Sequence, residues 1–388
     1  MRPSTAARGS SPFNRPATAS VMGNSTPTLA ASARAAAVPS NFPSGNVVPQ
    51  TIAAPRSNAS AARSRDGGMP LRFVGRTIAS FDLHVTRRAQ EITREGPERQ
   101  PVSIGAHVSI AGRIYEAIPR AEALGCECLQ IFYGSPRQWR RVSYPANDLA
   151  EFRRLRARAD IDPLVAHAPY LVNLASPNPR MRRHSIAALA HSTQGMEALR
   201  GFAVVTHIGS PMGTPWPEAR ARVARALRAA LAYSTRPVIL LEGSAGAGLG
   251  RNFEELREIL DETGEGRRLG VCLDTAHLFA AGWDLRTTAG VATMVESFDR
   301  VVGLRRLRAL HFNDSKAALG SHRDRHDNIG EGAIGRAGFR AIFSHPALRR
   351  LPGFIETPGF ARAGPDRRNV GLLKRLRADA LRRADAVK

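Results

Sequence analysis

Long apolar segments, paired cysteines and nucleotide-binding glycine motifs are all missing from this chain of 388 residues. No window is apolar enough to cross a membrane, so we expect no transmembrane helix. The cysteines Cys126, Cys128 and Cys272 are odd in number and form no CxxC pair, which argues against a disulfide framework and indicates small buried side chains in a reducing compartment. No GxxxxGK[ST] motif occurs and no GxGxxG follows a predicted strand, so a nucleotide-binding sheet has no support.

Acidic residues are scarce relative to basic ones, and the formal net charge is +23. Almost all of the positive side chains are arginine, and residues 101–388 alone carry 43 basic and 28 acidic residues. The excess reflects either genome composition or a polyanionic partner, and nucleic acid is the first candidate for that partner.

The first hundred residues differ in composition from the rest. Residues 1–65 contain seven arginines, no Asp or Glu, and many Ala, Ser, Pro, Thr and Asn. We predict that residues 1–100 are a disordered basic extension. Such a composition is also typical of an organellar transit peptide, and a solvated tail or an overlong start are the alternatives. A targeting role would place the protein in an organelle or the nucleus; otherwise we expect the bacterial cytoplasm, in association with the nucleoid.

From residue 103 onward the chain repeats a short apolar run, a polar or glycine-rich turn and a helical stretch. This alternation predicts parallel strands joined by helical crossovers. Eight such units fit a (β/α)8 TIM barrel, which needs about 250 residues, and a doubly wound open sheet is the alternative. The predicted strands are 103–108, 128–132, 163–167, 203–207, 237–242, 269–274, 307–312 and 353–357.

Local signals mark the start of two helices. Thr214 followed by Pro215 predicts an N-cap with proline at the first helical position, and Asn252 with Glu255 resembles a capping box.

The barrel domain is assigned to residues 101–365, and residues 366–388 are predicted to be a basic helix or tail. This last segment either adds affinity for nucleic acid or is a solvated helix. Its apolar side would contain Leu372, Leu376 and Ala380.

Most predicted strands end in a side chain that can bind a metal ion. The carboxyl ends of all strands in a TIM barrel meet at one face, where active sites lie, so these side chains would share one pocket. A lone histidine there is usually structural and a lone carboxylate usually caps a helix, but six of eight strands would each need a separate reason. The residues are His167, His207, Glu242, Asp274, His311 and Glu356.

Three further candidates bring the number of ligand-type residues to nine: His277, three residues after Asp274, and the Asp-x-His pair Asp324 and His326 in SHRDRHDNIGEGAIG. Nine residues exceed the three or four ligands that one zinc ion takes. Crowded buried carboxylates also need cations to neutralise them. We therefore predict two or three ions, zinc by ligand type, with manganese or iron also compatible. Clustered divalent ions recur in phosphoester cleavage.

Five segments of the chain resemble the endonuclease IV family of apurinic/apyrimidinic (AP) endonucleases. They occur in the family's order between about residue 103 and residue 360, and the DxxHxFAAGxDL and DRHxxIGxGxIG patterns are specific to that family. The segments are IGAHVSIAG, HAPYLVNLASP, LGVCLDTAHLFAAGWDL, HFNDSK and GSHRDRHDNIGEGAIG.

The resemblance implies a TIM barrel with three Zn2+ ions, for which Mn2+ or Fe2+ can substitute. All nine ligand positions match the family's motifs. The first ion would be held by His167, His207 and Glu242. Glu242 would bridge to a second ion, also bound by Asp274, His311 and Glu356. The third would be held by His277, Asp324 and His326.

The resemblance also implies a reaction in base excision repair of DNA. The family hydrolyses the phosphodiester 5′ to an abasic site in double-stranded DNA, leaving a 3′-hydroxyl and a 5′-deoxyribose phosphate, and removes blocking groups from 3′ ends. A hydroxide held between the first two ions would attack phosphorus. Glu242 and Glu356 would be the catalytic residues, with Glu356 orienting the attacking water. We expect a monomer that has no membrane partner.

Contacts with DNA carry over from the same resemblance. Arg137, in SPRQW, matches an arginine that enters the base stack, and Tyr170 and Leu171, in HAPYL, match residues that fill the gap left by the flipped nucleotide. Ordinary core packing is the alternative for Tyr170. His107, at the end of the first strand, is expected to orient a ligand or water.

The chain departs from the family's usual pattern without losing a ligand. Ile208 stands where Pro is common, Ala276 where Cys is common, and Arg113 where Gly is common; Gly243 and Ala247 alter the loop after Glu242. Two other interpretations remain: a metal-dependent sugar isomerase or epimerase of the same architecture, for which the Asp324–His326 loop would have no purpose, and a catalytically silent DNA-binding barrel.

Overall fold

The computed structural model describes residues 102–246 and 248–386. The predictions for residues 1–100, and the departure noted at Ala247, lie outside the described residues.

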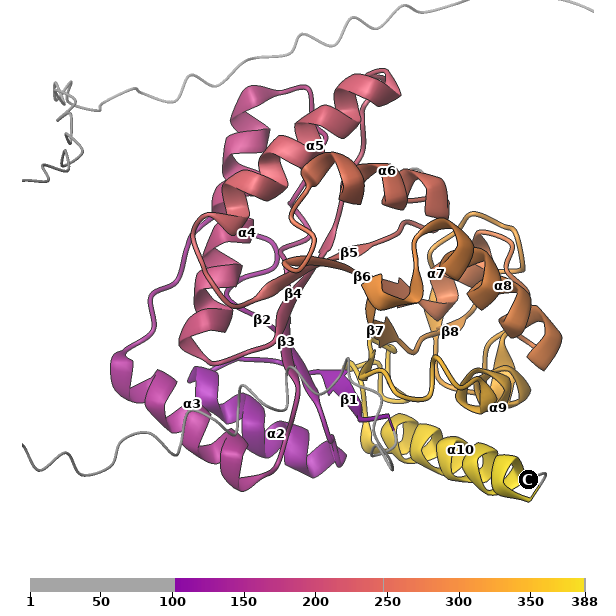
Figure 1. Ribbon diagram of the computed structural model, residues 1–388. Coiled ribbons are helices and arrows are strands. Elements are labelled where there is room, and N and C mark those ends of the chain that lie inside the picture. Colours follow the sequence, from indigo (N-terminus) through magenta and orange to yellow (C-terminus); the bar gives the residue numbers. More distant parts are fainter. Residues whose placement is uncertain (1–101, 247, 387–388) are drawn as a thin grey trace, which may run out of the picture. The chain divides into compact units, whose positions relative to one another are not determined.

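Eight parallel strands form a closed barrel in the order β1-β10-β7-β6-β5-β4-β3-β2 (Figure 1). The TIM barrel prediction is therefore confirmed and the open doubly wound sheet is wrong, because β1 pairs with β10 on one side and with β2 on the other. The barrel strands are β1 Ile104–His107, β2 Leu129–Phe132, β3 Leu164–His167, β4 Ala203–His207, β5 Val238–Glu242, β6 Leu269–Asp274, β7 Leu307–His311 and β10 Gly353–Ile355.

Helices follow the strands and surround the barrel (Figure 1). They are η1 Ile114–Glu116, α2 Ala117–Leu124, α3 Ala146–Arg158, α4 Pro179–Ala198, α5 Trp216–Leu231, α6 Phe253–Thr263, α7 Thr275–Ala280, α8 Thr288–Val301, η2 Leu304–Arg306, α9 Gly335–Ser344 and α10 Arg367–Asp385.

Each barrel strand lies within its predicted range, whereas one helix start differs from its prediction. Helix α5 begins at Trp216 with Pro215 in the N-cap position, because Pro215 has an extended ψ of 145°. At the second predicted helix start the N-cap is confirmed, since the Asn252 side chain accepts a hydrogen bond from the Glu255 backbone N–H. The reciprocal bond of a capping box does not form, because the Glu255 carboxylate accepts from the Gly250 and Arg251 N–H groups instead.

The buried apolar side chains form two layers, one that fills the barrel lumen and one that lies between the strands and the surrounding helices. The inner layer consists of alternating strand residues such as Val165, Val205, Leu240 and Cys272. The outer layer packs the other faces of the strands against the helices. Because side chains alternate along a strand, the position two residues beyond each inner residue also faces the lumen.

The predicted burial of the three cysteines is confirmed, and all three are free thiols.

Helix α10 packs on the barrel through Val370, Leu373, Leu376 and Ala380, which are buried. Its Arg377 donates hydrogen bonds to Glu127. Burial of this side excludes the fully solvated helix that composition allowed. Among the described residues, no helix is long and apolar enough to cross a membrane.

Candidate metal centre

The ligand-type residues at the strand ends converge because of the strand period. Val165, Val205, Leu240, Cys272, Ala309 and Phe354 point into the lumen, and each is followed two residues later by a histidine or a carboxylate. Parallel strands carry these second residues to the carboxyl end of the barrel. The structure therefore brings together His167, His207, Glu242, Asp274, His311 and Glu356.

One group of donors consists of His167, His207 and Glu242, whose donor atoms lie within 4.8 Å of one another. His167 Nε2 is 3.1 Å and His207 Nε2 is 3.6 Å from Glu242 Oε2. Two imidazole nitrogens thus approach the same carboxylate oxygen.

The other oxygen of Glu242 belongs to a second group, with Asp274, His311 and Glu356. His311 Nδ1 lies 3.0 Å from Glu242 Oε1, 3.5 Å from Glu356 Oε2 and 3.8 Å from Asp274 Oδ2. Glu242 therefore joins two adjacent groups, one through each oxygen, as a bridging ligand would.

A third group lies around His277 of α7 and His326 of the short strand β9, His326–Asp327. The two Nε2 atoms lie 3.1 Å and 3.2 Å from the oxygens of Asp324. His326 Nε2 is also 3.6 Å from Asp274 Oδ2. Asp274 is buried whereas the Asp324 side chain is 55% exposed, so the third group opens to solvent on the Asp324 side.

The tautomers of the buried histidines are those of metal ligands. His167 Nδ1 lies 2.7 Å from the Ala168 carbonyl oxygen, and His277 Nδ1 lies 3.0 Å from that of Gly243. Each Nδ1–H therefore donates to its carbonyl, and each Nε2 faces the carboxylates as the nitrogen left to bind a metal ion. The Nε2 atoms of His277 and His326 are buried, and although they lie 3.1 and 3.2 Å from oxygens of Asp324, neither makes a well-aligned hydrogen bond among the described residues.

The electrostatics of the cluster favour cations. Burial opposes charge on His277, but Asp274 and Asp324 outweigh it and raise the pKa to about 10. For His326, burial is likewise outweighed by Asp274 and Asp324, and the pKa rises to about 9. Burial alone would raise the pKa of Glu242, yet His207 and His311 hold it well below its usual range. The carboxylates thus form a strongly negative site, which divalent ions neutralise in place of protons.

A buried glutamine that the sequence reasoning missed supports the second group. Gln130 is fully buried in β2, two residues beyond the inner residue Cys128. Its Oε1 accepts from His311 Nε2 at 2.9 Å, and its Nε2 donates to Glu356 Oε1 at 2.7 Å. Gln130 thereby leaves His311 Nδ1 free for a ligand role. A polar residue at an inward position of an apolar strand was the available signal.

Asn313 also positions ligands, and the sequence reasoning missed it too. Its Nδ2 donates to Asp274 Oδ2 at 2.6 Å, and its Oδ1 accepts from the Glu356 backbone N–H at 2.7 Å. Its position two residues after His311 was the only sequence signal.

Asp314 holds the glycine-rich loop that follows the third group. It begins β8, Asp314–Ser315, which pairs antiparallel with β9. This buried carboxylate accepts backbone hydrogen bonds from Ser315, Gly330, Gly332, Ile334 and Gly335 at 2.8 to 3.2 Å. A Cβ at Gly332 would lie 2.5 Å from Asp314 Oδ1, so the loop closes around the carboxylate only with glycine at that position.

The side chains expected to contact DNA lie beside this centre. Tyr170 is 61% exposed, which excludes core packing, and its ring meets Phe132 edge-on at 5.1 Å. Arg137 is exposed and Leu171 is half-buried. The Tyr170 N–H donates to the Pro136 carbonyl at 3.1 Å, which joins the two loops.

His107 lies inside the centre, as its position at a strand end suggested. Its Nδ1 lies 3.0 Å from Gln130 Nε2 and 3.3 Å from Glu356 Oε1. Burial lowers its pKa by more than Glu356 raises it, which favours the neutral imidazole, a group that can position Glu356 or a water.

The departures from the family pattern are accommodated locally. Ile208 and Ala276 are buried, and Arg113 pairs with Asp148. A Cβ at Gly243 would lie 2.5 Å from the Gly250 carbonyl oxygen, so this loop requires glycine there.

The fold and the site define a TIM barrel with clustered metal ligands at the carboxyl ends of its strands. The family model described as xylose isomerase-like TIM barrel matches residues 118–374. A D-tagatose 3-epimerase-like protein of known structure shares the fold, with a TM-score of 0.54 at 20% identity, over 74% of this chain and 99% of that chain.

Two comparisons at higher identity narrow this class. A protein named probable endonuclease 4 from Halothermothrix orenii is 38% identical over 275 residues, which cover 70% of this chain and 99% of that protein. The crystal structure of endonuclease IV from Thermus thermophilus matches with a TM-score of 0.63 at 34% identity, over 73% of this chain and 100% of that chain. The chain belongs to the endonuclease IV family.

Proposed function

We propose that this protein is an AP endonuclease of base excision repair. It cleaves the phosphodiester 5′ to an abasic site in double-stranded DNA, leaving a 3′-hydroxyl and a 5′-deoxyribose phosphate, and it removes blocking groups from 3′ ends. As a member of its family the chain is a metal-dependent, DNA-cleaving hydrolase. The observation that carries the proposal is the set of three donor groups that share Glu242 and Asp274.

The donor groups fit three divalent ions, which we assign as Zn2+. Imidazole nitrogens and carboxylate oxygens are ligands that zinc accepts, and no thiolate takes part. The first group is His167, His207 and Glu242, and the second is Glu242, Asp274, His311 and Glu356. The third is His277, Asp324 and His326, and the donor atoms of His277 and His326 also lie within 4.8 Å of a donor oxygen of Asp274. When bound, such ions supply Lewis acidity toward the phosphate and lower the pKa of water.

The protein's own residues position the attacking water. Glu356 receives a hydrogen bond from Gln130 through Oε1, which leaves Oε2 facing His311 and the centre. Glu356 is therefore suited to orient a water molecule for attack on phosphorus. This role needs an ionised carboxylate. Burial raises the pKa of Glu356, but His311 and His107 outweigh that effect and keep the pKa below the usual range.

Recognition of the lesion falls to the exposed rim. An abasic nucleotide lacks a base to stack, so its extrusion from the duplex costs little. Tyr170 and Leu171 would fill the resulting gap, and Arg137 would enter the base stack. The high exposure of Tyr170 supports this role.

A sugar isomerase or epimerase is the second candidate, since those barrels share the fold. They use one or two ions, and the group around His277, Asp324 and His326 would then lack a purpose. This group is the feature that favours a three-ion phosphodiesterase.

Product analysis on a duplex with a single tetrahydrofuran abasic analogue tests the proposal. Hydrolysis 5′ to the analogue predicts a 3′ end that a DNA polymerase extends directly, and a second oligonucleotide that retains the 5′ phosphate. A second duplex with a reduced abasic site separates the two cleavage chemistries, because the reduced sugar cannot undergo β-elimination but can still be released by hydrolysis. A fully metal-loaded protein that left this duplex intact, yet epimerised ketohexoses, would overturn the proposal.

A further inference from the structure

One outer surface of the barrel carries positive charge with little compensation. Between residues 163 and 217 the only acidic residue is Glu197, near the end of α4. Helix α4 starts with Arg180, Arg182 and Arg183 in its first two turns, and the facing helix α5 carries Arg222 and Arg225.

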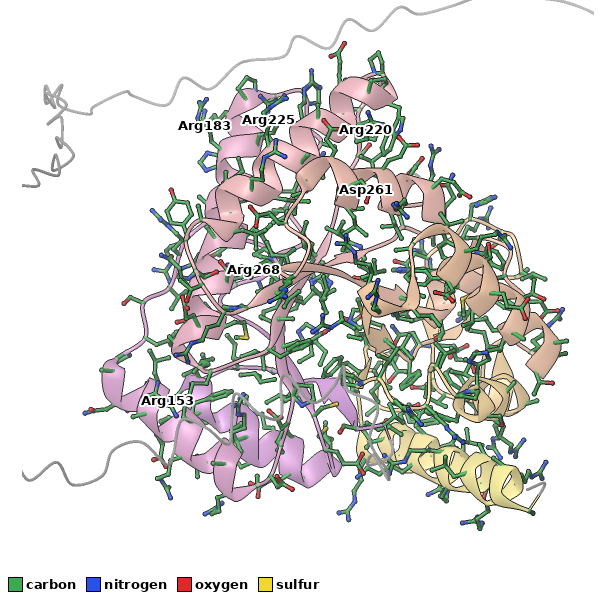
Figure 2. All side chains as sticks on the ribbon, viewed as in Figure 1. Arg153, Arg183, Arg220, Arg225, Asp261 and Arg268 are labelled. Carbon is green, nitrogen blue, oxygen red and sulfur yellow. The ribbon has the colours of Figure 1, made fainter. Side chains whose placement is uncertain are left out.

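Four of these guanidinium groups lie close together. Burial and the charges of Arg222, Arg225 and Arg183 lower the pKa of Arg182. Figure 2 labels Arg183 and Arg225 next to each other over α4 and α5. We call the four side chains, Arg182, Arg183, Arg222 and Arg225, the α4–α5 arginine surface.

Among the residues that the structure describes, only one carboxylate pairs with these four arginines. Arg222 pairs with the exposed Glu218 at 3.1 Å. In the described part of the chain, Arg182, Arg183 and Arg225 make no ion pair. The opposite side of α5 differs, because Arg220, labelled in Figure 2, pairs with Glu258 and Glu262 of α6. Repulsion between these like charges is unfavourable, and a bound polyanion would relieve it.

The surface is joined to the loops that leave the metal centre. Arg182 Nη1 donates to the Ser176 and Pro177 carbonyls of the loop after β3, at 2.7 and 3.0 Å. Arg222 Nη1 donates to Thr214 Oγ1 in the loop after β4, at 2.9 Å. The Leu174 N–H donates to the Ile208 carbonyl at 3.1 Å, which connects the two loops.

The direction of the helices gives the position of the surface. Helices α4 and α5 follow β3 and β4, so they begin at the end of the barrel where His167 and His207 lie. With a rise of 1.5 Å per residue, Arg225 lies about 14 Å along α5 from that end. The surface thus extends outward from the rim of the site.

We propose that the α4–α5 arginine surface binds the phosphate backbone of the duplex that flanks the lesion, outside the nucleotides at the metal centre. This inference rests on the proposed function and deepens it. Arg182 and Arg222 are committed to loop contacts, whereas Arg183 and Arg225 are exposed and uncommitted. The latter two are therefore the groups to substitute.

The test compares Arg183→Gln/Arg225→Gln with Arg300→Gln/Arg305→Gln. The control removes the same charge from exposed arginines at the opposite end of the barrel, where α8 ends and β7 begins. Fluorescence anisotropy measures the affinity for an undamaged duplex of about 40 base pairs, or about 140 Å, which is long enough to contact the rim of the site and the arginine surface together. A hairpin-closed undamaged duplex of about 12 base pairs serves as the short probe.

We expect the test variant to bind the long duplex roughly 10- to 60-fold more weakly at 0.1 M salt, and the slope of log K against log salt to fall by about 2. The loss of affinity in the test variant should be smaller on the short probe. The inference is overturned if the control variant binds the long duplex as weakly as the test variant does. It is also overturned if the test variant loses the same factor in affinity on the long and the short probe. Because undamaged DNA is used, these outcomes do not depend on whether the wild type cleaves abasic sites.

Discussion

Gln130→Met removes the hydrogen bonds that hold His311 and Glu356 while leaving side-chain volume nearly unchanged. In the wild type the glutamine accepts from His311 Nε2 at 2.9 Å and donates to Glu356 Oε1 at 2.7 Å. Methionine can do neither, so a buried N–H is left without an acceptor, at a cost of about 1–3 kcal/mol. His311 also becomes free to change tautomer and turn its Nδ1 into a donor. Removing such an outer partner typically costs 10- to 100-fold in metal affinity or activity.

Two readouts separate a positioning role from a general loss of stability. Metal affinity is measured by competition with a chromophoric chelator, and nicking of an abasic duplex is measured at saturating metal. Thr193→Val is the matched control, because Thr193 is a buried side chain whose one hydrogen bond within the described residues goes to the Ala190 carbonyl of its own helix. We expect lower metal affinity and a lower kcat for Gln130→Met, and neither change for the control. Unaltered metal affinity and kcat in Gln130→Met would refute the reasoning.

Three further substitutions probe other parts of the structure. Glu242→Gln should lower nicking on the order of 100-fold or more with little loss of DNA binding, because Glu242 joins two donor groups rather than gripping phosphate; unchanged cleavage would contradict that assignment. Asp314→Asn replaces an acceptor oxygen with an NH2 group that faces backbone donors, so unfolding by denaturant should show a loss of about 2–3 kcal/mol, and metal analysis should show selective loss of one ion; an intact metal content would refute the role in holding the loop. Glu127→Gln tests the docking of α10. Burial raises the pKa of Glu127, but Arg377 and the Ile104 N–H lower it further, and the net shift is downward. A lowered folded-state pKa stabilises the protein above the unfolded pKa of about 4.3 and loses that effect as pH falls. We therefore expect a deficit of about 1–2 kcal/mol at pH 7 that shrinks and closes as the pH falls below the unfolded pKa of about 4.3. A deficit independent of pH would be inconsistent with the ion pair.

The fold was predictable because its signals are local. Each barrel strand is an apolar run of four to six residues, apart from the three-residue β10, and parallel strands place all of their carboxyl ends on one face. A histidine or carboxylate at the end of such a run was therefore sufficient to predict convergence. The division into groups such as His167, His207 and Glu242 was implied only by the family resemblance.

The remaining features depend on contacts between distant residues. Strands β8 and β9 contain two residues each, which is too short for any periodicity. Asp314 gathers donors from as far as Gly335, and no spacing rule identifies that set. Likewise, composition revealed an excess of arginine without showing that Arg183 and Arg225 share a surface.

Gln130 is an intermediate case. Its place in β2 follows the same alternation that points Cys128 into the lumen, so inward orientation was predictable. Its partners were not, because His311 and Glu356 lie 181 and 226 residues away. The tautomer that it imposes requires the packed barrel.

The most direct test of the proposed function combines metal analysis with abasic-site cleavage on one preparation. We predict about three zinc ions per chain, nicking of a tetrahydrofuran-containing duplex, loss of nicking on exhaustive chelation, and recovery when zinc is restored. A protein that retained three ions and its full fold, yet left the abasic duplex uncut, would contradict the central claim.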